Sequence, residues 1–296
     1  MRSQQQSRRR SGWRLLDRRV SAPPTTDLPA PQPIHLPGRG DTAIFDTGPR
    51  DGEPLILLHA LSCTSLLTWY PSVSALAARY RVIGLDQRWH GAGIKSNTFS
   101  LEDCADDVAA LATELGIDEF AVAGYSMGSF VGQLVARRHA DRLRGLVLCA
   151  STRSIRRRQR YRTAFDTSIR LAARLPPRAR RRLSTAAPNP DLPVDHRWLF
   201  GEFRKTTVSA NLAAINAIAS FNSTAWVREI RTPTAVVVMQ RDGAIPPRDQ
   251  RAIAKAIPGA RHFEVDAGHA GCVFNPDKFV PALVSACDWV HEQARQ

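Results

Sequence analysis

The sequence predicts an α/β protein with a mostly parallel central sheet flanked by helices and interrupted by a helical insertion. Short, continuously apolar runs alternate with segments of helical periodicity, which is typical of a sheet covered on both faces. The residues that can carry chemistry follow the apolar runs, where the carboxyl ends of parallel strands form a ligand crevice. At 296 residues the chain is long enough to bury one large core.

The expected strands are short and apolar, as strands buried on both faces are. In chain order they are residues 55–58, 81–85, 120–123, 144–149, 234–239 and 262–265. A helix is predicted over 101–115, because apolar residues recur on one side and Ser100 can cap its first turn, with Asp103 three residues on. Two further helices are expected, after residue 128 and around 251–254.

Residues 151–224 break this alternation. They contain no clear strand, and helical stretches around 161–175 and 198–218 are separated by proline-rich segments. We therefore expect a core formed by residues 41–150 and 225–296, with the insertion between two of its strands. Six apolar residues of the insertion could line a pocket, although most should only attach it to the core: Phe200, Phe203, Leu212, Ile215, Ile218 and Phe221.

The stretch Gly124-Tyr125-Ser126-Met127-Gly128 lies between an expected strand and an expected helix. This is the pattern of a nucleophile elbow, in which a serine projects from a tight turn and small flanking residues let the neighbouring chain pass close by. Ser126 is therefore a candidate nucleophile. Such a serine needs a base, and the base needs an acid that orients it.

Two later loops supply candidates for these partners. Asp242 follows the expected strand 234–239, and His269 follows the expected strand 262–265. Alternatively, Asp242 before Gly243 is an ordinary turn residue and His269 a surface histidine. His90 competes as a base, and we interpret it as structural. Glu264 and Asp266 precede His269 and are interpreted as solvated or turn-forming.

Four motifs in this order resemble the α/β-hydrolase superfamily, close to its bacterial esterase-like branch with a helical cap, over about residues 41–293. They are His59-Ala60-Leu61, the turn from Asp86 to Gly91, the Ser126 elbow and the Asp242/His269 pair. The resemblance implies that Ser126 is the nucleophile, His269 the general base and Asp242 the orienting acid. It also implies that 151–224 is a cap that excludes water from the serine.

By the same resemblance, the backbone amides of Leu61 and Met127 form the oxyanion hole. The family usually has glycine where this chain has Ala60, and often where it has Trp89. Trp89 either packs under the cap or lines the acyl pocket, or is simply a partly buried packing residue. His59, Ala60, Trp89 and Tyr125 are the candidate pocket residues.

The formal net charge of +14 is concentrated in two segments. Residues 1–40 hold eight Arg and two Asp, and residues 151–185 hold twelve Arg and one Asp. Residues 1–40 are expected to be a disordered basic, proline-rich tail. The basic segments predict weak contact with an anionic membrane surface, whereas the absence of any nucleic-acid motif argues against specific nucleic-acid binding. Alternatively, these arginines lie on helix faces that are simply solvated and bind no partner.

No apolar signal region or transmembrane-length run is present, so a cytoplasmic protein that touches membranes only peripherally is expected. The five cysteines are scattered and suggest neither disulfides nor a metal site, although Cys63 and Cys272 could make the enzyme sensitive to thiol reagents. No cofactor is expected.

The predicted activity is hydrolysis of small or lipid-like carboxylic esters through an acyl-enzyme on Ser126. Alternatives on the same three residues are acyl transfer and cofactor-free perhydrolase chemistry of the haloperoxidase type. A non-catalytic ligand-binding homologue is the remaining possibility. The sequence does not define the acyl chain, the alcohol or the oligomeric state.

Overall fold

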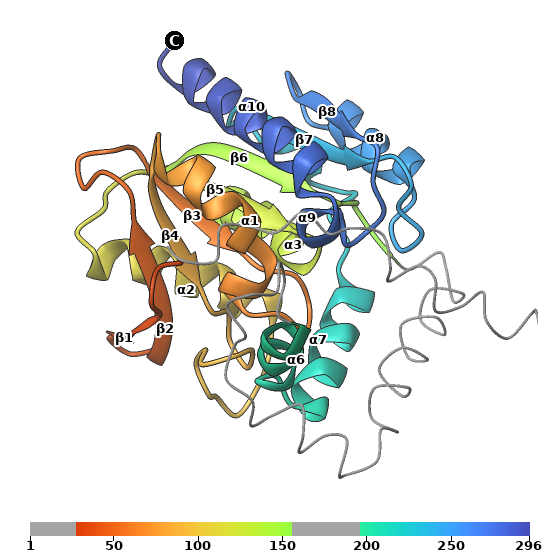
Figure 1. Ribbon diagram of the computed structural model, residues 1–296. Helices are drawn as coiled ribbons and strands as arrows, with labels where there is room; N and C mark the ends of the chain where they lie inside the picture. The colour runs from red at the N-terminus through yellow and green to blue at the C-terminus, as the bar shows by residue number, and fades with distance from the viewer. Residues whose placement is uncertain (1–27, 156–195) are drawn as a thin grey trace, which may run out of the picture.

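The computed structural model describes residues 28–155 and 196–296, and these build one eight-stranded sheet (Figure 1). The order across the sheet is β1-β2-β4-β3-β5-β6-β7-β8. The strands are β1 (Gln32–Leu36), β2 (Gly40–Thr47), β3 (Pro54–Leu58), β4 (Arg81–Leu85), β5 (Phe120–Tyr125), β6 (Leu143–Cys149), β7 (Thr234–Met239) and β8 (Arg261–Val265).

The six strands from β3 to β8 are parallel to one another, whereas β2 is antiparallel to both of its neighbours, β1 and β4. These six are the strands predicted from the sequence, so the mostly parallel α/β fold is confirmed. Because they all run the same way, the loops that follow them meet at one edge of the sheet, and this edge positions the candidate site.

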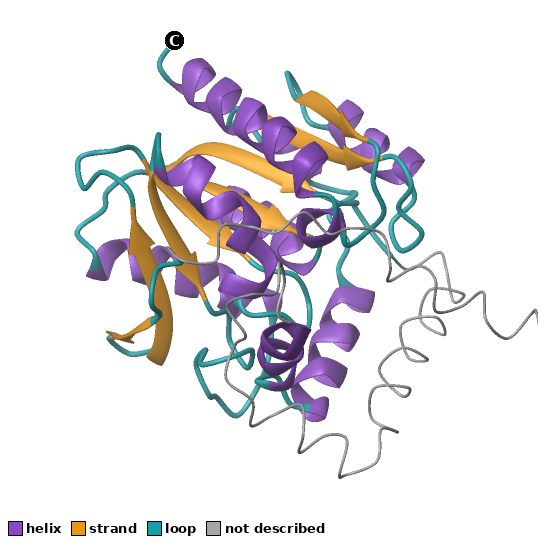
Figure 2. Ribbon diagram, in the orientation of Figure 1, coloured by secondary structure: helices purple, strands orange, loops and turns teal. Residues whose placement is uncertain are grey.

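Helices cover both faces of the sheet (Figures 1 and 2). Successive residues of a strand point to opposite faces, so Leu55 and Leu57 lie in one apolar cluster while Ile56 and Leu58 lie in the other. One face carries α1 (Ser65–Ala77), α9 (Gly271–Phe274) and α10 (Pro276–Ala294); the other carries α2 (Leu101–Glu114), α3 (Met127–Arg138) and α8 (Pro247–Ala256). A short 3₁₀ helix, η2 (Val227–Glu229), precedes β7. Ser100 caps α2 as predicted, because its side chain accepts a hydrogen bond from the Asp103 amide.

The expectation that all of residues 1–40 lie outside the fold is wrong. Strand β1 pairs with β2 through a turn in which the Arg39 amide donates to the Leu36 carbonyl. Pro33 is compatible with this strand because β1 is at the edge of the sheet, where a missing N–H is tolerated. The sequence signal was weak because only Leu36 of the strand is buried. Residues 1–27 of the expected tail lie outside the described residues.

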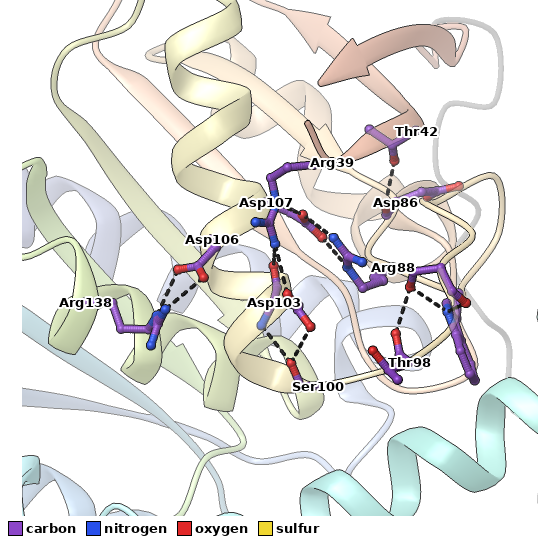
Figure 3. A network of polar contacts seen from close by, with 12 residues as sticks. Arg39, Thr42, Asp86, Arg88, Thr98, Ser100, Asp103, Asp106, Asp107 and Arg138 are labelled. Carbon is purple, nitrogen blue, oxygen red and sulfur yellow. Dashed lines mark hydrogen bonds and ion pairs between the residues drawn. The ribbon is translucent and has the colours of Figure 1, made fainter. Parts of the chain in front are cut away.

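A buried ion-pair network joins this turn to the rest of the fold (Figure 3). Asp107 on α2 has a side chain that is only 3% exposed and accepts two hydrogen bonds from Arg88, at 2.7 and 2.8 Å. Arg39 also donates to Asp107, and it contacts Asp103 one turn earlier. The network therefore connects the β1–β2 turn, α2 and the loop after β4.

Between β6 and β7, the described part of the insertion contains α6 (His196–Arg204) and α7 (Val208–Ser220). They replace the single helical stretch expected over 198–218. The two helices are separate because Thr207 has an extended backbone and acts as the N-cap of α7. Its side chain accepts a hydrogen bond from the Ala210 amide. The helical stretch expected around 161–175 lies outside the described residues, as does most of the basic segment 151–185. That the insertion is a cap stays a prediction.

Three of the six apolar residues named in the insertion attach it to the core. Ile218 and Phe221 are buried in the main cluster, and Ile215 packs against it. Phe203 and Leu212 are instead 45% and 50% exposed, and the Phe200 side chain lies outside the described residues. Among the helices in the described ranges, none is long and apolar enough to cross a bilayer.

Candidate active site

Three loops at the carboxyl edge of the sheet bring the predicted residues together. Ser126 directly follows β5, Asp242 lies three residues after β7, and His269 lies four residues after β8. Parallel strand direction therefore places side chains that are 143 residues apart in the sequence within hydrogen-bond distance.

The turn at Ser126 has the strained geometry of an elbow. Its φ of 51° and ψ of −109° are unusual for a residue with a side chain. The two glycines make the turn possible: a Cβ at Gly124 would lie 2.2 Å from the Gly128 carbonyl oxygen, and one at Gly128 would lie 2.2 Å from the Leu58 carbonyl oxygen. Any larger residue would push α3 away from the sheet.

A continuous hydrogen-bond chain connects the three side chains. Ser126 Oγ lies 3.0 Å from His269 Nε2, and His269 Nδ1 lies 2.8 Å from Asp242 Oδ2. The carboxylate can only accept, so Nδ1 carries the proton and Nε2 is free to accept from the serine hydroxyl. The His269 side chain is 25% exposed, which leaves it a route to solvent. This arrangement can activate a serine for attack on an acyl carbon.

Asp242 is fully satisfied as an ionised acceptor. Its Oδ1 accepts from the amides of Ala244 and Ile245, each at 2.8 Å, and its Oδ2 accepts from Gln250 Nε2 at 2.9 Å as well as from His269. Gln250 in turn donates to the Ile245 carbonyl and accepts from the Met239 amide. Sequence reasoning missed Gln250, because a polar residue in the first turns of an amphipathic helix looks like a surface residue.

Tyr125 does not line a pocket as predicted. Its ring is 1% exposed and packs edge-to-face against Trp69 and Phe279, and its hydroxyl donates to the His269 carbonyl at 2.8 Å. Successive side chains of a strand point to opposite faces of the sheet, so the Tyr125 side chain points into the apolar cluster and not into the site. The hydrogen bond from Tyr125 therefore fixes the position of the loop that carries His269.

The predicted oxyanion amides belong to Leu61, in the loop after β3, and to Met127, the first residue of α3. Within the described part of the chain, neither N–H has a hydrogen-bond partner. By contrast, the adjacent Ala60 amide donates to Thr68 Oγ1 at 3.1 Å, and the Gly128 amide donates to the His59 carbonyl at 3.1 Å. The two amides that an oxyanion would need are therefore the unoccupied ones.

His59, another predicted pocket residue, is completely buried and joins three loops. Its Nδ1 donates to the Ala60 carbonyl and its Nε2 accepts from the Gln87 amide, while its own carbonyl accepts from Gln87 Nε2 and from Gly128. Burial lowers the pKa of His59 to about 4, so the ring stays neutral and keeps its acceptor nitrogen. His59 is thus a structural residue of the site.

His90 is structural, as interpreted from the sequence. It is fully buried, and its Nδ1 donates to the Arg88 carbonyl at 3.0 Å. Burial, with the neighbouring His59 ring at 5.2 Å between centroids, lowers the pKa of His90 to about 3. Its Nε2 has no partner among the described residues.

Trp89 is a partly buried packing residue, the simplest of the interpretations, and its contacts lie within its own loop. Its Nε1 donates to Ser96 at 3.0 Å and its ring contacts Phe99. Its φ of 66° explains why a glycine often suits this position. Ala60, the other departure, is half-buried and packs against the apolar cluster of Cys63, Leu67, Tyr70 and Leu199.

A buried chain of hydrogen bonds under the elbow was not predicted. Ser129 donates to the Ser126 carbonyl at 2.6 Å, Ser151 lies 2.8 Å from Ser129, and Gln133 donates to Ser151. Ser223 then donates to Gln133 Oε1 at 2.6 Å. Gln133 therefore ties the start and the end of the insertion to the helix that begins at the elbow.

The remaining candidates lie outside this arrangement. Glu264 pairs with Arg251, and Asp266 pairs with Lys278. The thiols expected to be sensitive are both buried, and burial raises the pKa of Cys63 to about 12 and that of Cys272 above its usual range, which keeps both unreactive. In the described ranges, no group of three or more His, Cys, Asp or Glu could hold a metal ion.

Comparison with known proteins supports the relationship suggested by the motifs. A Mycobacterium tuberculosis protein, provisionally named a non-heme bromoperoxidase, is 30% identical over 244 residues, which are 79% of this chain and 93% of the relative. A provisionally named carbamate hydrolase of Azorhizobium caulinodans is 27% identical over 84% of this chain and 96% of its own length. The crystal structure of the enol-lactonase of Burkholderia xenovorans LB400 superposes with a TM-score of 0.67 at 26% identity, covering 87% of this chain and 100% of that one.

The profile of the α/β-hydrolase fold family matches residues 53–162, a segment that contains the loop after β3 and the Ser126 elbow. The bromoperoxidase-like relative extends the similarity over most of the chain. From its strand order, its elbow and these relatives, the chain belongs to the α/β-hydrolase family.

Proposed function

We propose that the protein is a serine hydrolase that cleaves carboxylic esters of small or lipid-like acyl groups. The observation that carries the proposal is the chain Ser126–His269–Asp242, with both links at hydrogen-bond distance and the histidine tautomer fixed. The membership of the family makes acyl chemistry at this serine the natural use of that geometry.

In the proposed reaction, Ser126 Oγ attacks the ester carbonyl carbon while His269 Nε2 takes its proton. The negative charge on the former carbonyl oxygen is stabilised by the amides of Leu61 and Met127. His269 then gives the proton to the departing alcohol, which leaves an acyl-enzyme. Water attacks the acyl-enzyme with His269 again as base, so the acid is released and Ser126 regains its proton.

Asp242 stays ionised throughout and stabilises the imidazolium. It is well suited to this because four donors surround its carboxylate, with two backbone amides on one oxygen and His269 and Gln250 on the other. The positive charge that forms on His269 therefore meets a fixed negative partner that needs no rearrangement.

A second candidate is perhydrolysis, in which hydrogen peroxide replaces water as the acceptor of the acyl group. The relative provisionally named a non-heme bromoperoxidase favours including it. The relatives named carbamate hydrolase and enol-lactonase suggest that carbamates and lactones belong in the substrate screen. All these substrates present an acyl carbon to the same serine.

The first test is hydrolysis of p-nitrophenyl esters from acetate to palmitate by the wild type, Ser126→Ala and a control, Ser74→Ala, whose serine is exposed on α1. We expect turnover with a chain-length optimum in the wild type and the control, and loss of about 10³-fold or more in Ser126→Ala with an unchanged melting temperature.

Retained activity in a pure Ser126→Ala preparation would overturn the assignment of the nucleophile. If the wild type hydrolyses no ester but converts them to peracids when peroxide is added, the second candidate replaces the first.

A further inference from the structure

The loop that carries the proposed oxyanion donor Leu61 is anchored at two ends by different parts of the molecule. At the start, His59 and Ala60 are held by the core, through Gln87 and Thr68. At the end, the loop is held by the two helices of the insertion, α6 and α7. Leu61 lies between these anchors.

The contact with α7 is a single short hydrogen bond. Ser62 Oγ donates to Asn211 Oδ1 at 2.6 Å, and Asn211 is 7% exposed. The Asn211 side chain is itself oriented, because its Nδ2 donates to the Thr207 carbonyl at 3.1 Å. Since a carbonyl can only accept, this bond fixes which end of the amide faces Ser62.

Ser62 needs such an anchor because its backbone is in the left-handed region, with φ at 67°. A serine adopts this conformation only when its surroundings impose it. The Cys63 amide donates to the Ala60 carbonyl at 3.2 Å, which closes a turn with Leu61 and Ser62 as its two central residues. The Leu61 N–H and the left-handed Ser62 therefore belong to one turn, so a change in the Ser62 backbone also displaces the proposed oxyanion donor.

The contact with α6 is also polar. Thr64, the N-cap of α1, donates to Glu202 Oε2 at 2.6 Å, and Glu202 is 5% exposed. Lys205 on α6 pairs with the other carboxylate oxygen of Glu202. A cavity of about 290 Å³ lined by Glu202, Lys205 and Asp86 adjoins this contact, so apolar packing does not seal this part of α6 against the core.

We propose that Asn211 is a positioning residue for the oxyanion hole: its Oδ1 holds Ser62 in the left-handed conformation that aims the Leu61 amide at the substrate oxyanion. The proposal rests on the proposed function. Helix α7 thereby contributes to the chemistry without touching the substrate, and the oxyanion hole is complete only while α7 is docked. Glu202 stabilises the same loop from α6.

The proposal makes a distinctive prediction, because glycine adopts a φ of 67° without strain. Asn211→Ala should lower kcat about tenfold or more with little change in KM, which is less than the roughly 10²- to 10³-fold loss from removing an oxyanion donor entirely. Adding Ser62→Gly to Asn211→Ala should recover most of the lost rate. A merely structural role for Asn211 would not predict this rescue.

The experiment measures kcat and KM on the best p-nitrophenyl ester, and the inactivation rate by a fluorophosphonate. The variants are Asn211→Ala, Ser62→Gly, the double variant and, as a matched control, Asn216→Ala, whose side chain is exposed on the same helix. Ser62→Ala provides a second route, since it removes the same hydrogen bond and keeps the strain. We expect it to match Asn211→Ala.

Wild-type rates in Asn211→Ala, or a defect that Ser62→Gly does not relieve, would overturn the proposal while the esterase assignment stands. If Asn211→Ala fails to fold, wild-type rates in Ser62→Ala would overturn it equally. If the wild type turns over no ester, fluorophosphonate labelling of Ser126 still reports the oxyanion hole, so failure of the proposed function is distinguishable from failure of this inference.

Discussion

Polar residues with no exposed surface determine the geometry around Ser126. Gln250 fixes the Asp242 carboxylate, Gln133 ties the helix behind Ser126 to the insertion, and Tyr125 holds the carbonyl of His269. Each of these side chains makes its hydrogen bonds inside the protein, where an unpaired polar group would destabilise the fold. The side chains that we propose as catalytic are therefore held in place by buried neighbours before any substrate binds.

The most direct test of this preorganisation is Asp242→Asn. The two backbone amides will keep the oxygen of the introduced carboxamide, so its NH₂ group faces His269 Nδ1. The imidazole must then accept at Nδ1 and carry its proton on Nε2, where it can no longer take the proton of Ser126. We expect kcat on p-nitrophenyl esters to fall about 10⁴-fold with little change in fold.

The control for this variant is Asp266→Asn, which replaces an aspartate of the same loop region whose side chain is 52% exposed. It should leave kcat within about twofold of the wild type, because the Asp266 side chain is exposed and makes its ion pairs with Arg241 and Lys278, not with the Asp242–His269 pair. An equal loss in both variants would mean that Asp242 acts through loop structure and not through the tautomer of His269.

The proposed catalytic residues were predictable from the sequence, and their supports were not. Ser126, Asp242 and His269 follow predicted strands, which placed them on loops at one edge of the sheet, and the resemblance to the α/β-hydrolase family predicted that they converge. Gln133, Gln250 and Asn211 lie on helices, where a polar residue normally marks the solvent face. Only the packing of a helix against a neighbour reveals that these amides are buried.

At the level of elements, the sheet divides into a predictable and an unpredictable part. The strands β3 to β7 are apolar and almost fully buried and were identified from the sequence, and so was the edge strand β8, although only Val265 of it is buried. Strand β1 was missed because only its Leu36 is buried, and β2 was missed because polar residues flank its short apolar stretch. The β1–β2 hairpin is attached through the pairing of β2 with β4, and also through charge, since Arg39 in its turn reaches Asp107 on α2 (Figure 3).

The variant Asp107→Ala tests how much this attachment contributes. It would leave the guanidinium groups of Arg39 and Arg88 without their shared partner, and Arg88 is 6% exposed. Breaking a buried ion pair from one side costs about 3 to 5 kcal/mol, because the remaining charge stays buried. Urea unfolding should show a loss of free energy of that size.

Glu119→Ala removes a partner of Arg144 from an exposed pair and is the matched control. It should not change the unfolding midpoint measurably, because solvent screens such pairs. An unfolding free energy for Asp107→Ala equal to that of the control would show that solvent screens the Asp107 network as well.

For the whole molecule, three core loops converge on one buried pair of histidines. His59 receives the Gln87 amide from the loop after β4 and binds Gly128 at the elbow, and His90 packs against its ring. The ring of His59 must be neutral for its Nε2 to accept from the Gln87 amide, and burial keeps the ring of His90 neutral as well. The free energy of unfolding therefore depends on pH through these two histidines, which lie next to the loop that carries Leu61.

The sign of this linkage follows from the lowered pKa values. The pKa values of His59 and His90 are about 4 and about 3 in the folded protein, against 6.5 when unfolded. Below pH 6.5 the unfolded chain binds protons that the folded protein excludes, so the unfolding free energy falls as the pH falls. Between about pH 7 and pH 5 each histidine should contribute a loss of about 2 kcal/mol.

Urea unfolding at about pH 7, 6 and 5 measures this loss, and His90→Gln separates one histidine from the other. Glutamine can still donate to the Arg88 carbonyl but cannot be protonated, so the variant should lose about half of the pH dependence contributed by the pair. His262→Gln, on the exposed part of β8, controls for removing a histidine from the surface. An unchanged pH dependence in His90→Gln would show that the fold admits water or a proton to this ring, and the buried histidine pair would then not account for acid instability.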